Sequence, residues 1–118
     1  MSYKQQLGLR MADDILGMFE TEVLDALVRR PHEAYGISIQ AEIAAQGRKP
    51  SLGALYTTLD RLEAKGMVTS RWGEPTTQRG GRRKRYYTVT GKGQFALNRT
   101  HEAFFRRGWV MSPRPVGA

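Results

Sequence analysis

The sequence contains no cysteine and no long hydrophobic run. Without cysteine the chain can form no disulfide, no thiolate-bound zinc or iron–sulfur cluster, and no cysteine nucleophile. The apolar runs extend over only a few residues, so we expect neither a membrane-spanning helix nor a secretory signal core. These features are compatible with a protein of the reducing cytoplasm, which is the location we expect.

A catalytic constellation is also missing from the sequence. The two histidines, His32 and His101, stand far apart and have no metal-ligand partner at a suitable spacing. The pair Gly80-Gly81 lacks the strand–loop–helix setting of a phosphate-binding loop. With no acid/base pair and no activated nucleophile in view, we expect no enzyme, no metal and no cofactor.

Acidic residues are scarce, and the basic excess is confined to one half of the chain. The 118 residues include 19 Lys and Arg against 11 Asp and Glu, a net charge of +8. Residues 1–59 hold six basic and seven acidic side chains, whereas residues 60–118 hold 13 and four. Such a field favours a polyanionic partner, nucleic acid before an anionic membrane surface, over a merely solvated basic face.

The remaining composition is that of an ordinary globular protein, with 40% apolar and 25% charged residues, and the length suits one domain. Apolar residues at helical spacing predict helices over residues 18–30, 35–46, 51–66 and about 90–107. Pro31 ends the first of these, and Ser51 is a good N-cap for the third. A helix within the extension 1–16 is predicted only weakly, because Gly8 and Gly17 interrupt it.

Between the third and fourth predicted helices the period changes to two. Residues 68–72 and 84–89 alternate and are rich in β-branched and aromatic side chains, which is typical of strands. Residues 73–81 between them are rich in glycine and threonine and include Pro75. The segment therefore predicts a β-hairpin with a long basic tip.

Three helices followed by a hairpin is the element order of a winged helix, an α+β and mostly helical fold. In this fold the third helix lies in the DNA major groove and the hairpin, or wing, reaches the neighbouring backbone or minor groove. If the leucines of residues 52–62 face the core, the outer face is small and polar, which lets the helix enter a groove deeply. The alternative is an ordinary amphipathic helix with a featureless outer face. That outer face holds Gly53, Ala54, Thr57, Arg61 and Ala64, flanked by Tyr56 and Thr58.

The hairpin is the sharper signal. Residues 82–85 are four consecutive cations beside a glycine-rich tip. Like charges repel, so a purely structural role does not favour this density, whereas arginine suits a narrow and negative minor groove. We therefore favour nucleic-acid contact over a solvated face for this segment.

Two motifs at the right separation make the chain resemble the PadR family of winged-helix transcriptional regulators, over about residues 17–93. Residues 50–66, PSLGALYTTLDRLEAKG, are similar to the family's Pro-Ser-x-Gly-x-Leu-Tyr, Leu-x-x-Leu-Glu and Gly pattern. Residues 81–90, GRRKRYYTVT, are similar to its wing, and Tyr35-Gly36-Ile37 opens the second helix as in the family. The sequence departs from the pattern at Ala34, where the family usually has glycine.

The resemblance implies a homodimeric repressor that binds double-stranded operator DNA, with a winged-helix domain over residues 17–90. Ser51 and Tyr56 would then contact phosphates, and Thr57 and Arg61 would face the bases. The full expected DNA-binding set is Tyr35, Lys49, Ser51, Gly53, Ala54, Tyr56, Thr57, Thr58, Arg61, Arg79, Arg82, Arg83 and Lys84.

The family also dimerises through its C-terminal helix, here residues 91–109, and often through the first helix. The short C-terminal region fits the short-tailed branch of the family, and we expect residues 110–118 to be a disordered tail. Aromatic residues near the end of the helix would pack the dimer, the alternative being a site for a small aromatic effector. The expected interface set is Phe19, Val23, Phe95, Leu97, His101, Phe104, Phe105 and Trp109.

Other readings of the chain remain open. Tyr86 and Tyr87 beside arginines could stack on RNA bases, although alternation along a strand should turn at least one of them into the core. The protein could also be a non-specific basic binder, or a winged-helix module that contacts another protein. Membrane association is weaker, because the basic cluster lies on a hairpin and not on an amphipathic helix.

Overall fold

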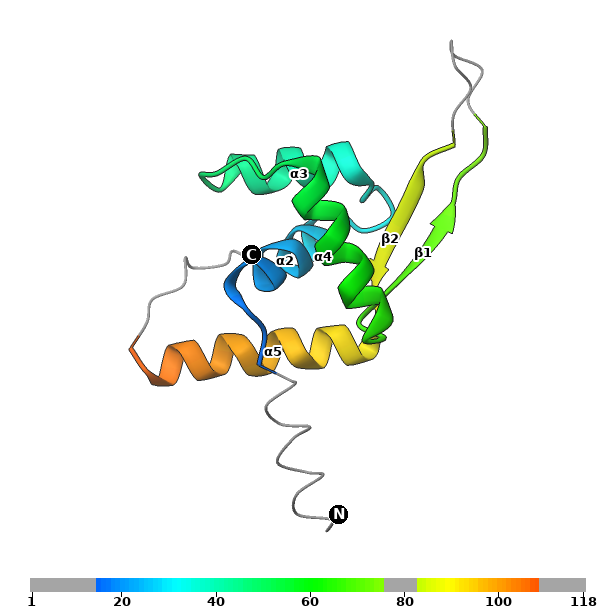
Figure 1. Ribbon diagram of the computed structural model, residues 1–118. Coiled ribbons are helices and arrows are strands. Elements are labelled where there is room, and N and C mark those ends of the chain that lie inside the picture. Colours follow the sequence, from blue (N-terminus) through cyan, green and yellow to red (C-terminus); the bar gives the residue numbers. More distant parts are fainter. Residues whose placement is uncertain (1–14, 76–82, 109–118) are drawn as a thin grey trace.

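A computed structural model describes residues 15–75 and 83–108 (Figure 1), and this part of the chain is α+β and mostly helical. The predicted order of helices and hairpin is confirmed, with ends within about two residues of those expected. The extension 1–14, the residues 76–82 and the tail from 109 lie outside the described residues. The elements are α2 (Met18–Arg29), α3 (Gly36–Ala45), α4 (Leu52–Ala64), β1 (Val68–Trp72), β2 (Arg85–Val89) and α5 (Gly91–Arg106).

Helix α2 is the centre of the fold, because it contacts α3, α4, α5 and β2. Its apolar side is fully enclosed, and the leucine stripe of α4 and the isoleucines of α3 pack against it. Two residues predicted at the dimer interface, Val23 and Leu97, lie inside this core, so that prediction is wrong for them. Their helices carry apolar residues on more than one side, and these two side chains face the chain's own interior.

Helices α3 and α4 form the helix-turn-helix. The Gln40 amide donates to the Pro50 carbonyl at 2.8 Å and fixes the start of α4 against α3. Ser51 caps α4 as predicted, with its Oγ accepting from the Ala54 amide at 3.1 Å. Gly66 ends the helical segment with a φ of +78°, a conformation that other residues adopt only with strain.

The two strands form an antiparallel hairpin with Val68 opposite Val89 and Trp72 opposite Arg85. The segment before α3 joins the other edge of β2, where the Tyr87 amide donates to the Ala34 carbonyl at 2.8 Å. Ala34 is fully buried at this junction, so the departure from the family's glycine is accommodated. Beyond the junction the hairpin projects away from the helices (Figure 1).

Helix α5 lies across the side of the molecule that is opposite α3 (Figure 1). Thr90 caps it, accepting from the Gly93 amide at 3.1 Å and donating to the Gly66 carbonyl at 2.7 Å. The Leu16 amide donates to Thr100 Oγ1 at 3.0 Å and ties the chain before α2 to this helix. One side of α5 therefore belongs to the core, and the other side faces outward.

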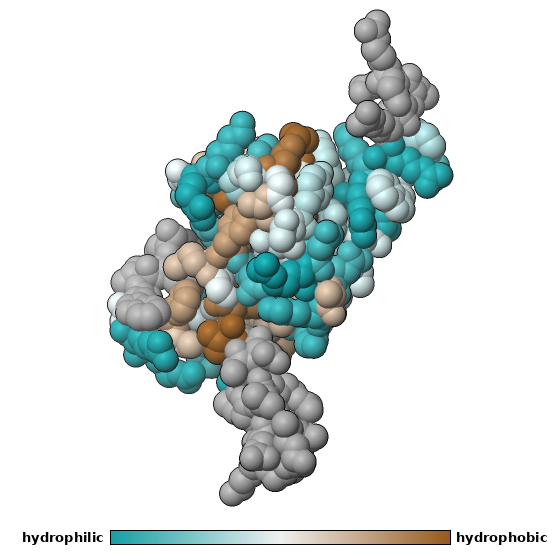
Figure 2. Space-filling view, in the orientation of Figure 1, coloured by the Kyte–Doolittle hydropathy of each residue, from teal (hydrophilic) through white to brown (hydrophobic). Residues whose placement is uncertain are grey.

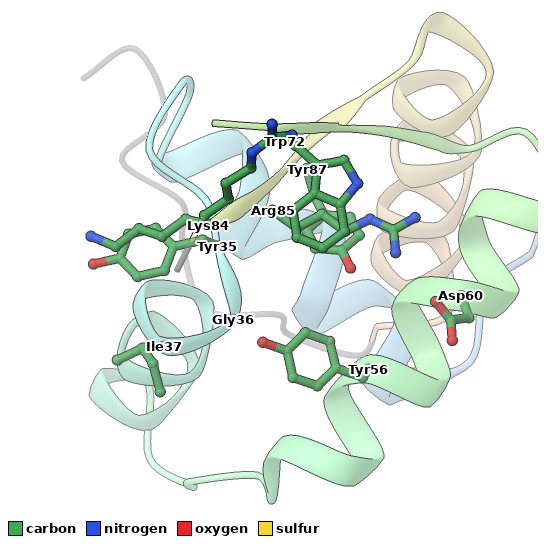
Figure 3. A pocket seen from close by; sticks show the side chains of 10 residues that line it. Tyr35, Gly36, Ile37, Tyr56, Asp60, Trp72, Lys84, Arg85 and Tyr87 are labelled. Carbon is green, nitrogen blue, oxygen red and sulfur yellow. The ribbon is translucent and has the colours of Figure 1, made fainter. Parts of the chain in front are cut away.

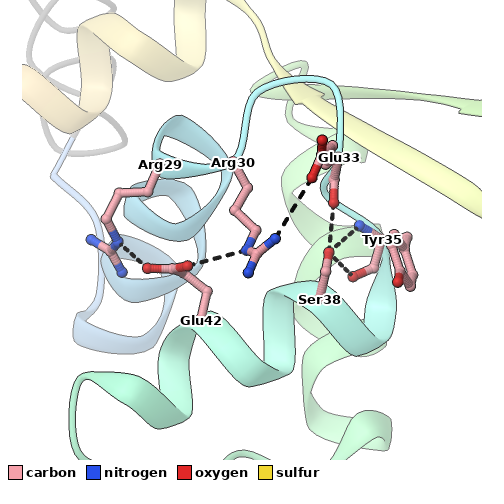
Figure 4. A network of polar contacts seen from close by, with 6 residues as sticks. All are labelled: Arg29, Arg30, Glu33, Tyr35, Ser38 and Glu42. Carbon is pink, nitrogen blue, oxygen red and sulfur yellow. Dashed lines mark hydrogen bonds and ion pairs between the residues drawn. The ribbon is translucent and has the colours of Figure 1, made fainter.

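A partly buried cluster of one carboxylate and two arginines joins the end of α2 to α3 (Figure 4). Glu42 Oε2 lies 2.7 Å from Arg29 Nε, and its Oε1 lies 3.2 Å from Arg30 Nε. The hydrogen bond from Arg29 holds the pKa of the Glu42 carboxyl below its ordinary value, and the bond from Arg30 adds to this, against an opposing effect of burial. These contacts therefore link the end of α2 directly to α3.

Candidate nucleic-acid interface

The exposed face of α4 is made of small and polar side chains, as the leucine stripe predicted. Leu55, Leu59 and Leu62 are fully buried. Gly53, Ala54, Thr57 and Arg61 all lie on the exposed side. Thr58, which was expected to contact DNA, is only 6% exposed and turns into the core, so that prediction is wrong. It follows Thr57 on the helix, and a rotation of about 100° per residue places the two threonines on different sides.

No contact or backbone conformation within the described structure requires glycine at position 53. A Cβ built at this position meets no atom within 4 Å, and the backbone conformation is an ordinary one. Glycine within a helix costs about 0.5–1 kcal/mol relative to alanine. An exposed glycine with open space around it favours close approach by an outside partner.

Gly36, by contrast, is required by a contact within the chain. A Cβ at this position would collide with the Tyr56 hydroxyl, which lies directly over the start of α3 (Figure 3). Tyr56 therefore spans from α4 to the first turn of α3. The first amides of a helix lack intrahelical partners and attract anions, so the hydroxyl and these amides gather at one place that suits a phosphate.

A groove of about 580 Å³ separates the start of α3, the exposed side of α4 and the hairpin. Figure 3 shows aromatic rings from three elements around it, with Lys84 at one side and Asp60 at the other. Burial raises the pKa of the Tyr87 hydroxyl, so this ring stays neutral at physiological pH. The groove is lined by Tyr35, Gly36, Ile37, Tyr56, Asp60, Trp72, Arg83, Lys84, Arg85 and Tyr87.

Two cations on the outer part of the hairpin rest on aromatic rings. Lys84 Nζ lies 4.4 Å from the centre of the Tyr35 ring, and the Arg71 guanidinium lies 4.7 Å from that of Tyr86. The rings of Tyr35 and Tyr86 pack edge to face, with 5.7 Å between their centres. Figure 2 shows this part of the described surface as strongly hydrophilic. Stacking on rings limits the motion of the cations while their charges stay accessible to an anion.

The structure brings most of the expected DNA-binding residues to one side of the molecule. Tyr87 is buried and Tyr86 lies at the outer face, as strand alternation predicted. Arg79 and Arg82 lie outside the described residues. The expected residues found at the surface on α4, at the start of α3, in the loop before α4 and at the hairpin are Tyr35, Lys49, Ser51, Gly53, Ala54, Tyr56, Thr57, Arg61, Arg83 and Lys84.

Sequence reasoning missed two exposed apolar residues on this side. Trp72 is 58% exposed and lines the groove, although its strand pattern resembled that of a core residue. The hairpin extends beyond the helices at this point, so its inner face loses its cover. Ile37 is exposed in the first turn of α3. An apolar residue directly after the helix-opening Tyr35-Gly36 pair was the available signal.

The outward side of α5 carries exposed aromatic rings, and the Arg99 guanidinium lies 5.7 Å from the centre of the Phe95 ring. Phe95 and Phe105 are 53% and 81% exposed. Ile15 and Met18, around the start of α2, are exposed as well. Figure 2 shows an apolar patch where the chain entering α2 crosses α5. Of the other residues expected at a dimer interface, Phe19, His101 and Phe104 are partly buried, and Trp109 lies outside the described residues.

Neither a metal site nor a membrane span emerges from the described part of the chain. Within residues 15–75 and 83–108, no group of three or more His, Cys, Asp or Glu side chains could hold a metal ion. No helix in the same ranges combines the length and apolarity that crossing a membrane requires.

Comparison with known proteins gives consistent relatives. Transcriptional regulator Rv3488 of Mycobacterium tuberculosis is 36% identical over 74 residues, which are 61% of this chain and 64% of that protein. A PadR family regulator from Clostridium difficile superposes with a TM-score of 0.66 at 22% identity, covering 78% of this chain and 92% of that one. Bacillus subtilis PadR, solved in complex with operator DNA, superposes with a TM-score of 0.58 at 22% identity, covering 83% of this chain and 50% of that one.

These solved structures support the winged-helix fold that the element order predicted. The family model described as the PadR-like family of transcriptional regulators matches residues 23–99, from α2 into α5. That range includes α4, the hairpin and the groove between them. The predicted function class, a transcriptional regulator, is confirmed at this level. The chain belongs to the PadR-like family of transcriptional regulators.

Proposed function

We propose that the protein is a sequence-specific repressor that binds operator DNA as a homodimer. In this proposal α4 enters the major groove, and the hairpin follows the adjacent backbone into the minor groove. The observation that carries the proposal is the groove that the exposed side of α4 shares with Lys84, a hairpin cation that rests on the Tyr35 ring. Bacillus subtilis PadR, which shares this fold, was solved in complex with operator DNA, and this supports DNA as the partner.

Each part of this side suits a different part of a duplex. Thr57 and Arg61 are exposed on α4 and can donate to base edges. Tyr56 and the first turn of α3 suit a phosphate, and so do the free amides beyond Ser51. Lys84 and Arg83 add charge where the hairpin would follow the backbone. The winged-helix unit of residues 17–90 thus supplies base contacts and backbone contacts together.

The dimer would form through the outward side of α5, within the proposed dimerisation segment 91–109. Two exposed phenylalanines on one helix cost free energy in water, and aromatic residues are enriched at interfaces. Because α5 lies opposite α3, a second copy bound there leaves both α4 faces open. Such a dimer would read two half-sites about one helical turn apart. If these half-sites overlap a promoter, the bound dimer would block transcription.

A titration with a scrambled control tests the proposal. Duplexes selected from a random pool, and the DNA upstream of the protein's own gene, are titrated by fluorescence anisotropy over a salt series. We expect a dimer to bind the selected duplex about 10³-fold or more tightly than a scrambled one. Equal, strongly salt-dependent binding to both would indicate a non-specific basic protein. Preference for single-stranded RNA, or no binding at all, would favour the RNA or protein-interaction readings.

A further inference from the structure

Arg85 differs from Lys84 and Arg71, which also lie on the outer part of the hairpin, because it forms an ion pair with a carboxylate. Its terminal nitrogen lies 3.1 Å from Glu63 Oε1, and its Nε donates to Ser70 Oγ at 3.0 Å. Ser70 Oγ in turn donates to Glu63 Oε2 at 2.8 Å. The three side chains close a triangle that links the last turn of α4 to both strands of the hairpin.

Aromatic rings confine the same guanidinium. It lies 5.6 Å from the ring centre of Trp72 and 5.6 Å from that of Tyr87. Trp72 and Tyr87 share the inner face of the hairpin with Ser70 and Arg85. Within the chain, Arg85 therefore has its charge balanced by Glu63, two of its nitrogens hydrogen-bonded and two rings beside its guanidinium, which leaves it less to offer a phosphate than an unpaired cation has.

Besides this triangle, Tyr35 at the start of α3 contacts the outer part of the hairpin through Tyr86 and Lys84. Val68, Val89 and Tyr87 pack at its base against the core, whereas Trp72 is already mostly exposed. An isolated two-stranded hairpin is marginally stable in water. The Glu63–Ser70–Arg85 triangle lies between the packed base and the projecting end, where it can fix the direction of the hairpin relative to α4.

We propose that Glu63 is a positioning residue for DNA binding: through Arg85 and Ser70 it holds the hairpin at the angle at which hairpin and α4 contact one duplex. The proposal rests on the DNA-binding function proposed above. In this proposal the negative charge of Glu63 strengthens DNA binding, although it lies near the side that faces the DNA. Simple charge repulsion predicts the opposite, since a carboxylate should weaken attraction to phosphates.

Asp60 is a matched control for this effect. It lies one turn earlier on α4, is exposed, lines the groove, and has no ion-pair partner among the described residues. Asp60→Asn and Glu63→Gln each remove one negative charge from the same helix. They differ in whether a link to the hairpin is lost. A difference between the two variants therefore reports the link and not the charge.

Amide hydrogen exchange without DNA tests the link itself. In Glu63→Gln we expect the amides of residues 70–72 and 85–87 to exchange about tenfold faster than in wild type. This factor corresponds to the loss of one charged hydrogen bond. Core amides of α2 should keep their rates, and Asp60→Asn should match wild type throughout. Unchanged hairpin rates in Glu63→Gln, or a uniform increase over the whole protein, would overturn the positioning role.

Titration of the selected duplex over a salt series tests the consequence for binding. We expect Glu63→Gln to bind about tenfold more weakly, with a salt slope lower by about one as a hairpin phosphate contact is lost. Asp60→Asn should bind at least as tightly as wild type. Tighter binding by Glu63→Gln would refute the proposal. If wild type itself selects no duplex, the DNA-binding proposal fails, while the exchange rates still decide the link.

Discussion

Two sides of the molecule differ in the kinds of side chain that they expose. On the side of α4 and the hairpin, cations rest on tyrosine rings or pair with a carboxylate, as Lys84, Arg71 and Arg85 do. On the outward side of α5, Phe95 and Phe105 expose apolar rings to solvent. The first side keeps charges ordered for a polyanion. The second resembles half of an apolar interface.

Under the proposed function, one short chain divides DNA binding and dimerisation between opposite surfaces. Helix α2 lies between them and contacts both α3 and α5. A change on either surface should therefore act on one task first, and a change at the α2–α3 joint should act on the fold.

The largest effect should follow from removing the apolar side of α5. The double variant Phe95→Glu and Phe105→Glu places charges where a second copy would bury the rings, so we expect monomers. Loss of the second half-site should lower operator affinity about 100-fold or more. Analytical ultracentrifugation and anisotropy measure the two results. Phe105→Leu is the control and should stay dimeric, and a charged double variant that remains a dimer would place the interface elsewhere.

Replacing Arg61 should break the recognition side without touching α5. Arg61→Ala removes an exposed donor on α4, and we expect operator affinity to fall by about 1–3 kcal/mol, with reduced preference over scrambled DNA. Lys65→Ala removes a cation that is paired with Glu20 at 3.1 Å near the end of the same helix, and should change affinity little. Equal losses from both variants would mean that charge alone, and not base contact, drives binding.

Changing Glu42 should weaken the joint between the two sides. Glu42→Gln loses a charged pair with Arg29 and Arg30, and we expect the free energy of unfolding to fall by about 1–3 kcal/mol. Because the folded pKa is lowered from 4.5, this contribution is present above pH 4.5 and is lost as pH falls through the folded pKa. Urea unfolding from pH 7 to pH 3 should show wild type and variant converging in acid. A constant difference across this range would contradict the assignment.

The smallest effect sharpens the comparison most, because its two readouts have opposite signs. Gly53→Ala should raise the free energy of unfolding by up to about 1 kcal/mol, since a methyl group there meets nothing and helix propensity improves. The same methyl group should lower operator affinity several-fold by holding α4 away from the bases. Thermal unfolding and anisotropy measure the pair. Unchanged affinity would mean that α4 does not approach DNA at this position.

Much of the fold could be predicted because local signals agreed with one another. The leucine period of α4, the Ser51 cap and Gly66 all mark the same helix, and the change to period two marks the strands. The small outer face of α4 followed from the position of its leucines. Local pattern and global fold are consistent here, which is why element order sufficed.

The errors and omissions share a physical cause, which is that sequence period does not say what covers a face. Leu97 and Phe95 are both apolar and near each other on α5, yet one enters the core and the other faces solvent. Trp72 continues an inward strand pattern past the point where the body ends. The pairing of Glu63 with Arg85 spans 22 positions and depends on the hairpin's direction, which no local pattern encodes.

One measurement tests the division between the two sides most directly. The selected duplex is added to isotope-labelled protein, and amide NMR shifts are followed residue by residue. We predict the largest changes at the start of α3, along the exposed side of α4 and in β1 and β2, with the amides around Phe95 and Phe105 unchanged. Changes concentrated on α5, with α4 unaffected, would contradict the account.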